Sequence, residues 1–335
     1  MATVAPAAPV PVQPARPRLA GRTLTVPAMG GSLVLRVAHR PGAGDAGARQ
    51  AAGRDLARVA RRVDRWAARL TRYSGTSDLA ALNSDPAAAA VAVRPTLAAA
   101  LAWAERAMDL CPGLVDVTLL DERLAAEAGD PGGTGPGPLP PDPGTRPRWH
   151  LVRQARGGTA VRRGTFRFDL DGVAKGWIAD RALAMLRAYP AAMADADGDI
   201  ALRLGDGVAW DIAIADPRGD DAVLGVLRLD GRLPGGLVGV ATSGTSVHRW
   251  PGAAGEPPRH HLLDPRTRRP AITDVIQATV LMSTAREAEV LAKAVVIAGS
   301  DAGMDLLGRP GVHGAVLLLE SGDVVATPRT GEWLA

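Results

Sequence analysis

The sequence predicts an α+β fold in which mixed or antiparallel sheets pack against helices. Candidate strands come in runs rather than in strict alternation with helices, which argues against a doubly wound parallel sheet. Of the 335 residues, 47% are hydrophobic and 22% are charged, a balance typical of a globular chain with a sizeable core. Because only 3% are aromatic, alanine, valine and leucine must fill that core.

Periodicity places the elements of the first third of the chain. Residues 1–20 are rich in Ala and Pro and predict a disordered tail. From Met29 the apolar residues alternate with others, which indicates a strand. An apolar stripe at helical spacing predicts a helix over 51–70, and a proline suited to a first helical turn predicts another over 95–110.

Beyond these helices the pattern changes. Residues 129–148 are rich in Gly and Pro and can form neither a helix nor a central strand, so they are a domain linker or an inserted loop. Helices are expected over 176–188 and 284–298. Short strands are expected over 167–170, 199–204, 208–213, 237–242, 276–282, 315–319 and 324–327.

Composition argues against several classes of function. The sequence pI is 9.9 with a net charge of +4, but Lys175 and Lys293 are the only lysines, and the arginines are scattered rather than clustered. With few aromatics to stack on bases, nucleic-acid binding is not expected. The sequence contains no apolar run of about 18 residues, so no transmembrane helix is expected. Without a recognisable signal peptide or lipoprotein cysteine, the expected location is the cytoplasm.

Two loops have the residues to hold an anion. DGVAKG, at 171–176, joins an expected strand to an expected helix, so glycines permit close backbone approach and Lys175 adds a positive charge. TSGTS, at 242–246, offers hydroxyls that suit phosphate oxygens. Each loop is also compatible with an ordinary turn.

Three further sites carry groups that could take part in chemistry. His261, in HHLLDPRT, could act as a general acid or base at neutral pH, or could be an exposed histidine beside a turn. Glu289 and Lys293 share one face of an otherwise almost apolar helix, where a charged pair is either costly or functional. Cys111, the only cysteine, has no visible activating neighbour and is not expected to be a nucleophile.

The order of these segments resembles that of the ApbE family of FAD:protein FMN transferases, from about residue 29 to 327. DLDGVAKGWIADRAL, from Asp169, is the most similar to a family motif. RYSGTSDLAALN, from Arg72 to the only asparagine, precedes it, and TSGTS and HHLLDPRTRRP follow it in the family's order. The resemblance spans both sides of the Gly/Pro-rich stretch. It therefore implies a single domain over 21–335, with 129–148 as an inserted loop and the elements packed around one cleft.

The resemblance also implies a group-transfer reaction. FAD would bind in the cleft with its pyrophosphate near a divalent metal, normally Mg²⁺. A Thr or Ser hydroxyl of a target flavoprotein would attack the FMN phosphorus, so that FMN becomes linked to the target and AMP leaves. Some relatives let water attack instead and hydrolyse FAD. An FAD pyrophosphatase and a non-catalytic FAD-binding protein are therefore the alternatives.

Residue roles follow from the matched motifs. The resemblance implies His261 and Lys175 as catalytic residues, with His261 activating the acceptor hydroxyl. The metal would take the backbone carbonyl of Ala174, the carboxylate of Glu289 and the side chain at position 293. The residues implied to line the FAD site, with the last two near the phosphates, are Met29, Tyr73, Val115, Asp116, Val117, Asp171, Lys175, Thr242 and Ser243.

Several positions depart from the family pattern. The family usually has Asp and Thr where this chain has Glu289 and Lys293, and a protonated lysine cannot bind Mg²⁺. Either Lys293 pairs with Glu289, or its ammonium replaces the metal as the charge that faces the pyrophosphate. Asp197 stands where the family has a glycine, which adds a negative charge to the same region.

Overall fold

The computed structural model describes residues 20–39, 45–128, 148–205, 208–219, 222–230, 233–250 and 259–334. The tail expected over 1–20 and the loop expected over 129–148 lie outside these ranges, apart from one terminal residue of each. No helix within the described ranges is long and apolar enough to cross a membrane.

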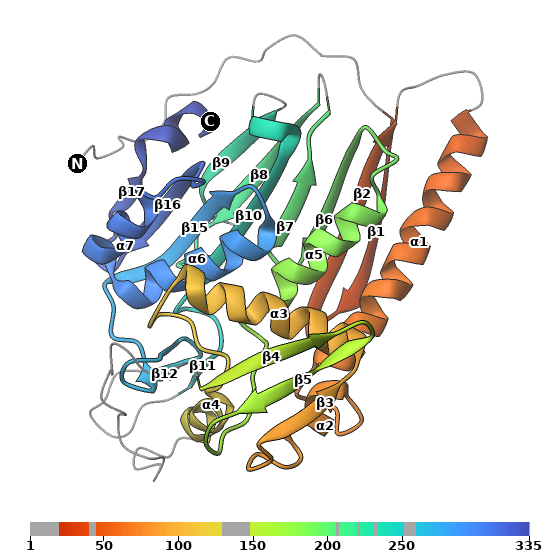
Figure 1. Cartoon of the computed structure of the whole chain (residues 1–335). Helices are drawn as coiled ribbons and strands as arrows, with labels where there is room; N and C mark the ends of the chain where they lie inside the picture. The colour runs from red at the N-terminus through yellow and green to blue at the C-terminus, as the bar shows by residue number, and fades with distance from the viewer. Residues whose placement is uncertain are drawn as a thin grey trace.

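One large antiparallel sheet organises the fold (Figure 1). Its strands, in spatial order, are β1 (Ala20–Ala28), β2 (Gly31–His39), β6 (Ala191–Ala196), β7 (Asp199–Arg203), β10 (Leu237–Gly244), β15 (Val275–Met282), β16 (Gly314–Leu319) and β17 (Val324–Ala326). Strands from both sides of residues 129–147 thus share one sheet.

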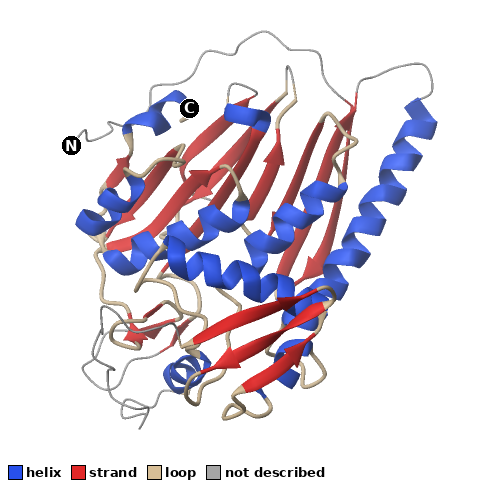
Figure 2. Cartoon of the chain, in the orientation of Figure 1, coloured by secondary structure: helices blue, strands red, loops and turns tan. Residues whose placement is uncertain are grey.

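Helices cover one face of this sheet, as Figure 2 shows. α1 (Asp45–Leu70), α5 (Ala174–Met185) and α6 (Ala285–Ala298) pack directly on its strands, and α3 (Pro95–Leu110) packs against α1 and α5. Strand alternation explains the layering, because alternate side chains point to opposite faces. Leu33 and Leu35 of β2 join the core under the helices, whereas Leu202 and Val240 join a second core on the other face.

Smaller elements complete the structure. The hairpin of β8 (Ala209–Ala215) and β9 (Val223–Asp230) covers the second core. A three-stranded sheet has the order β3 (Ala90–Val93), β5 (Gly157–Arg162) and β4 (Trp149–Gln154). The remaining elements are α2 (Asp78–Asn83), α4 (Leu120–Glu127), α7 (Ser300–Leu307), the short pairs β11 (Arg249–Trp250) with β12 (Arg259–His260) and β13 (Leu263–Asp264) with β14 (Arg269–Pro270), and two short 3₁₀ turns, Pro234–Gly236 and Pro328–Glu332.

The sequence-based elements can now be compared with the observed ones. The α+β class is confirmed, and the helix expected over 95–110 has those bounds. The helix expected from 51 begins earlier, at Asp45. The strand expected over 167–170 is wrong, because that segment is irregular and its Phe168 backbone bonds to a side chain, that of Asn83.

Candidate functional site

A pocket of about 250 Å³ brings together segments that lie far apart in the sequence. It is lined from the loop after α3, the loop before α5, the turn after β6, the end of β10, the segment 261–265 and α6. Ten of the residues selected from the sequence line it: Val115, Asp116, Val117, Asp171, Lys175, Thr242, Ser243, His261, Glu289 and Lys293. Met29, Tyr73 and Ala174 are not among the lining residues.

The glycines of DGVAKG lie close to atoms of α6. A side chain at Gly176 would meet the backbone of Ala285 and Arg286 at 2.7 Å, and one at Gly172 would overlap the Lys293 ammonium. Glycine is therefore required at position 176, where α5 meets the backbone of α6, whereas at position 172 the obstacle is the flexible end of the Lys293 side chain. Gly172 lines the pocket and Gly176 does not, so close approach of the backbone to a ligand stays an expectation for Gly172 alone.

Lys175 forms an ion pair with Asp197, the residue that stands where the family has a glycine. The Lys175 ammonium donates to Asp197 Oδ2 at 2.6 Å. Asp197 is in the turn between β6 and β7 with φ of 59°, in the left-handed region that aspartate and asparagine adopt more readily than most other residues with a side chain. Although burial opposes the charged form, the Asp197 carboxylate raises the pKa of Lys175. Lys175 is therefore a fixed cation at neutral pH, partly neutralised by its partner.

Glu289 and Lys293 both reach the pocket, but in different ways. A Glu289 oxygen accepts the N–H of Gly176 at 3.0 Å, while Lys293 Nζ donates to the Gly172 carbonyl at 2.5 Å. No ion pair between the two appears in the part of the chain that the structure describes. Burial raises the pKa of Glu289, since Lys293, the backbone N–H and Lys175 only partly offset the lost hydration.

Asp199 is a buried pocket residue that the sequence analysis did not select. It is 7% exposed, and burial followed by repulsion from Glu289 raises its pKa well above the usual value. Its position at the start of β7, in a strand otherwise rich in apolar residues, is a signal that could have identified it.

The residues present do not fit a bound Mg²⁺. Among the described residues no group of three or more His, Cys, Asp or Glu side chains is placed to hold a metal. At position 293 an ammonium, which has no lone pair, lies where the family pattern implies an oxygen ligand. Of the implied side-chain donors only Glu289 supplies oxygens, and one of its two oxygens already accepts the Gly176 N–H.

His261 is held in one tautomer. Its Nδ1 lies 3.0 Å from the Val247 carbonyl, which can only accept, so Nδ1 carries the proton and Nε2 keeps its lone pair. Burial, together with the positive charges of Arg123 and Lys293, lowers the pKa of His261 to about 3. The adjacent His260 is structural, because its Nε2 lies 2.9 Å from the Ala271 carbonyl in the interior.

Hydroxyl and carboxyl groups complete two walls of the pocket. Thr242 Oγ1 lies 2.9 Å from Thr279 Oγ1 on the neighbouring strand, and Ser243 follows it. On the other side, Asp116 Oδ1 accepts from the backbone N–H and the hydroxyl of Thr118 at 2.8 and 2.7 Å. Asp116 is therefore held in an Asx turn whose carboxylate borders the pocket.

Tyr73 and Met29 lie beside the pocket rather than in its lining. Tyr73 is 74% exposed, and its hydroxyl accepts from Arg72, whose guanidinium also contacts Asp171 of the lining at 3.4 Å. Met29 occupies the turn between β1 and β2 with φ of 56°. A side chain at Gly31, two residues later, would overlap that of Asp197, so this turn borders the pocket edge.

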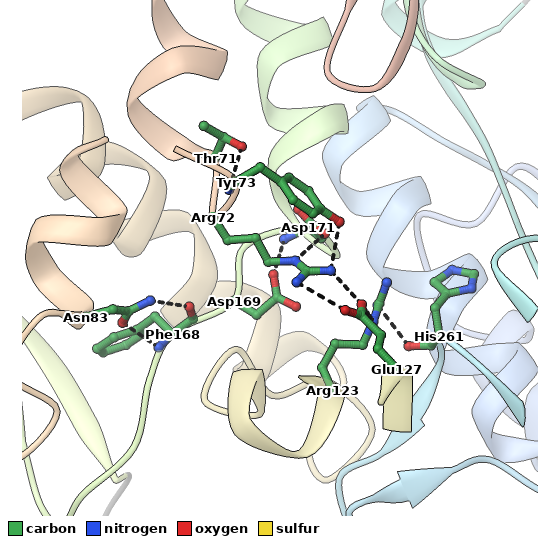
Figure 3. A network of polar contacts seen from close by, with 10 residues as sticks. All are labelled: Thr71, Arg72, Tyr73, Asn83, Arg123, Glu127, Phe168, Asp169, Asp171 and His261. Carbon is green, nitrogen blue, oxygen red and sulfur yellow. Dashed lines mark hydrogen bonds and ion pairs between the residues drawn. The ribbon is translucent and has the colours of Figure 1, made fainter. Parts of the chain in front are cut away.

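A chain of charged groups connects Tyr73 to the His261 segment (Figure 3). Glu127 Oε1 accepts from Arg72 Nη2 at 2.6 Å and from Arg123 Nε at 2.7 Å, and Arg123 Nη1 donates to the His261 carbonyl at 3.1 Å. Despite burial, these two guanidinium groups lower the pKa of Glu127. The sequence analysis missed Arg123 and Glu127, although their spacing of four residues on one helix indicates a pair.

Cys111 takes no part in this site. It is fully buried at the end of α3, and burial raises the pKa of its thiol to about 11. The thiolate, which is the nucleophilic form, is therefore disfavoured. This agrees with the expectation that Cys111 is not a nucleophile.

The chain is similar to known proteins over most of its length. The model of the ApbE family matches residues 29–317. A curated FAD:protein FMN transferase of Treponema pallidum (strain Nichols) is 30% identical over an alignment of 181 residues, and the match covers 49% of this chain and 45% of that protein. The chain thus spans somewhat less than half the length of that relative in the match.

Three solved structures share the fold. The ApbE protein of Thermotoga maritima has a TM-score of 0.72 at 22% identity, with 94% of this chain and 100% of that chain covered. The flavinyl transferase ApbE of Pseudomonas stutzeri, in its apo form, scores 0.69 at 20% identity over 94% and 97%. The flavin transferase ApbE of Vibrio cholerae scores 0.68 at 23% identity over 95% and 100%.

Proposed function

The chain belongs to the ApbE family, whose model matches most of its length, and from this membership and the pocket we propose that it transfers FMN from FAD to a Thr or Ser hydroxyl of a target flavoprotein. FAD is the substrate and AMP the second product. The relative from Treponema pallidum is named for this reaction.

The observation that carries the proposal is the free Nε2 of His261 in the pocket. Because Nδ1 donates to Val247, Nε2 can accept the proton of an acceptor hydroxyl. The hydroxyl oxygen forms a bond to the FMN phosphorus as the bond to the bridging oxygen breaks. AMP leaves with that oxygen, and the hydroxyl proton passes to His261 and then to solvent.

The other lining residues bind and orient the substrate. We assign Lys175 and the hydroxyls of Thr242 and Ser243 to the phosphate oxygens, because these donors line the pocket. Val115, Asp116, Val117 and Asp171 line the same pocket and are assigned to FAD. Met29, Tyr73 and Ala174 are assigned to its border, and no step is assigned to Mg²⁺, because the donor set does not fit it.

The remaining expectations belong to the same proposal. We propose one domain over 21–335 with 129–148 inserted in it, since the large sheet takes strands from both sides of that stretch. The partner is a flavoprotein that presents a Thr or Ser. A cytoplasmic location stays a prediction from the sequence.

The test is direct. The protein is incubated with FAD and a peptide that carries an Asp-Gly-Xaa-Thr acceptor, and AMP and fluorescent covalent flavin are quantified. We expect equal amounts of both, and much less of both with His261→Gln. A peptide with Ala for the acceptor Thr is the control. FMN and AMP released without acceptor would instead support an FAD pyrophosphatase, and FAD binding without any product would support a non-catalytic binding protein.

A further inference from the structure

We infer that the Lys293 ammonium takes the place of a divalent metal at the pyrophosphate, so that this chain performs its transfer reaction without a bound metal ion. The inference rests on the proposed function for the identity of the substrate. Its basis is the disagreement between the donor set in the pocket and the one that Mg²⁺ requires.

The position of Lys293 is fixed by its own contacts. Lys293 belongs to α6, and its Nζ donates to the carbonyl of Gly172 in the loop that precedes α5. The absence of a side chain at Gly172 is what makes room for the ammonium there. A lysine ammonium has three N–H donors, so two remain for a ligand in the pocket.

The charges around the pocket leave this ammonium available. Lys175 is bound to Asp197, and Arg123 is bound to Glu127. Among the described residues, in contrast, Lys293 forms no ion pair, and its bonding partner is a neutral carbonyl. Of these three lining cations, Lys293 is therefore the one without a direct ion pair, although its charge also acts on the buried carboxyl groups of Glu289 and Asp199.

The same charge disfavours a metal nearby. Glu289 and Asp199 are buried acidic groups of the pocket, and each is stabilised in its charged form by Lys293. A divalent cation held by Glu289 would stand close to a positive group that already occupies part of the site. Electrostatic repulsion and the missing oxygen ligand act in the same direction.

An ammonium can do the electrostatic part of the reaction. Two charge-assisted hydrogen bonds to phosphate oxygens would bind the pyrophosphate and stabilise the charge that develops on AMP as it leaves. Lysine binds phosphates in this way as a point charge. Lys293 keeps its protons throughout, so the balance of the transfer reaction does not change.

The experiment compares the wild-type protein with Lys293→Met and Lys293→Arg in EDTA and in Mg²⁺. FAD affinity is measured by flavin fluorescence, and product by AMP release and covalent flavin. We expect the wild-type protein to bind FAD and form product equally in both conditions. Lys293→Met is expected to bind FAD about 10- to 100-fold more weakly, the loss of hydrogen bonds from a charged group, and Lys293→Arg to lose less.

A direct measurement of metal binding completes the test. Mn²⁺ titration of the wild-type protein, with and without FAD, is followed by electron paramagnetic resonance, and no bound Mn²⁺ is expected. The inference is overturned if EDTA abolishes wild-type product and Mg²⁺ restores it, or if FAD binding by the wild-type protein requires the metal. Thermal unfolding of both variants verifies that they are folded.

These results also distinguish a failure of the proposed transfer reaction from a failure of the role given to Lys293. If no product forms in any condition, the transfer reaction is wrong. FAD binding that is insensitive to EDTA but weakened in Lys293→Met would then still support an ammonium at the pyrophosphate. If product forms only with Mg²⁺, the transfer reaction stands and the role given to Lys293 is wrong.

Discussion

Asn83 and Phe168 exchange two hydrogen bonds, although 84 residues of chain separate them. The Asn83 Nδ2 donates to the Phe168 carbonyl, and the Phe168 N–H donates to Asn83 Oδ1, each at 2.8 Å. A side-chain amide thus presents the same donor and acceptor as a neighbouring strand would. The pair fixes the segment that leads into DGVAKG, and hence the loop from which Asp171 and Lys175 reach the pocket.

Asn83→Ala should therefore lower stability markedly. Two backbone groups of Phe168 would lose their partner, and each unsatisfied group costs about 1 to 3 kcal/mol. We expect a loss of about 2 to 4 kcal/mol in the free energy of unfolding, measured by urea denaturation. Gln154→Ala removes an amide that donates to an exposed hydroxyl, and its loss should stay below about 0.5 kcal/mol. Equal losses in the two variants would contradict the role given to Asn83.

The same pair explains which parts of the fold could be predicted. Helix 95–110 was predictable because its apolar spacing and its first proline are local signals. The strand expected over 167–170 is wrong because the Phe168 backbone bonds to the Asn83 side chain instead of to a neighbouring strand, a tertiary contact that no local pattern shows. Likewise, the partners of Lys175 and Lys293 depend on turns and helices that meet only in the folded chain.

Asp197→Asn should strengthen FAD binding. The change removes a negative charge and releases Lys175 for the phosphates, while asparagine tolerates the left-handed backbone that Asp197 adopts. We expect the Kd for FAD, measured by fluorescence titration, to fall about 3- to 10-fold, as for one partly exposed charge pair. Asp301→Asn, at the exposed start of α7, is the control and should leave Kd unchanged. Weaker FAD binding in Asp197→Asn would show that the carboxylate assists the ligand.

The reaction should tolerate mild acid better than an ordinary histidine base permits. With its pKa lowered to about 3, His261 stays neutral as the pH falls from 8 to 5, so kcat/KM should show no loss near the usual histidine pKa of 6.5. Because a base with a pKa near 3 accepts a proton less readily than one near 7, His261→Gln should reduce kcat/KM by about 10²-fold across this range, the lower end of what a general base contributes. A wild-type profile that falls with a midpoint near 6.5 would contradict the proposed base.

Stability should respond to acid through the same side chain. Below pH 6.5 the unfolded chain binds a proton at His261 that the folded chain excludes down to about pH 3. The contribution of His261 to the free energy of unfolding is therefore fully present above pH 6.5. It decreases as the pH falls, by up to about 1.4 kcal/mol per pH unit. Urea denaturation at pH 7 and pH 5 should show a larger acid loss for wild type than for His261→Gln. Equal acid losses would show that His261 is accessible to protons in the folded state.

Glu127→Gln should show whether Glu127 positions His261 for catalysis in addition to stabilising the fold. Glu127 Oε1 receives hydrogen bonds from both Arg72 and Arg123, and Arg123 in turn holds the His261 carbonyl. A glutamine cannot neutralise two guanidinium groups, so we expect a loss of about 1 to 3 kcal/mol in unfolding free energy and a lower kcat for FMN transfer. Glu122→Gln is the matched control, because Glu122 lies on the same helix and pairs with Arg268 at 3.1 Å. It should lose stability with kcat unchanged. If both variants lose kcat alike, the contact between Arg123 and the His261 carbonyl does not position the base.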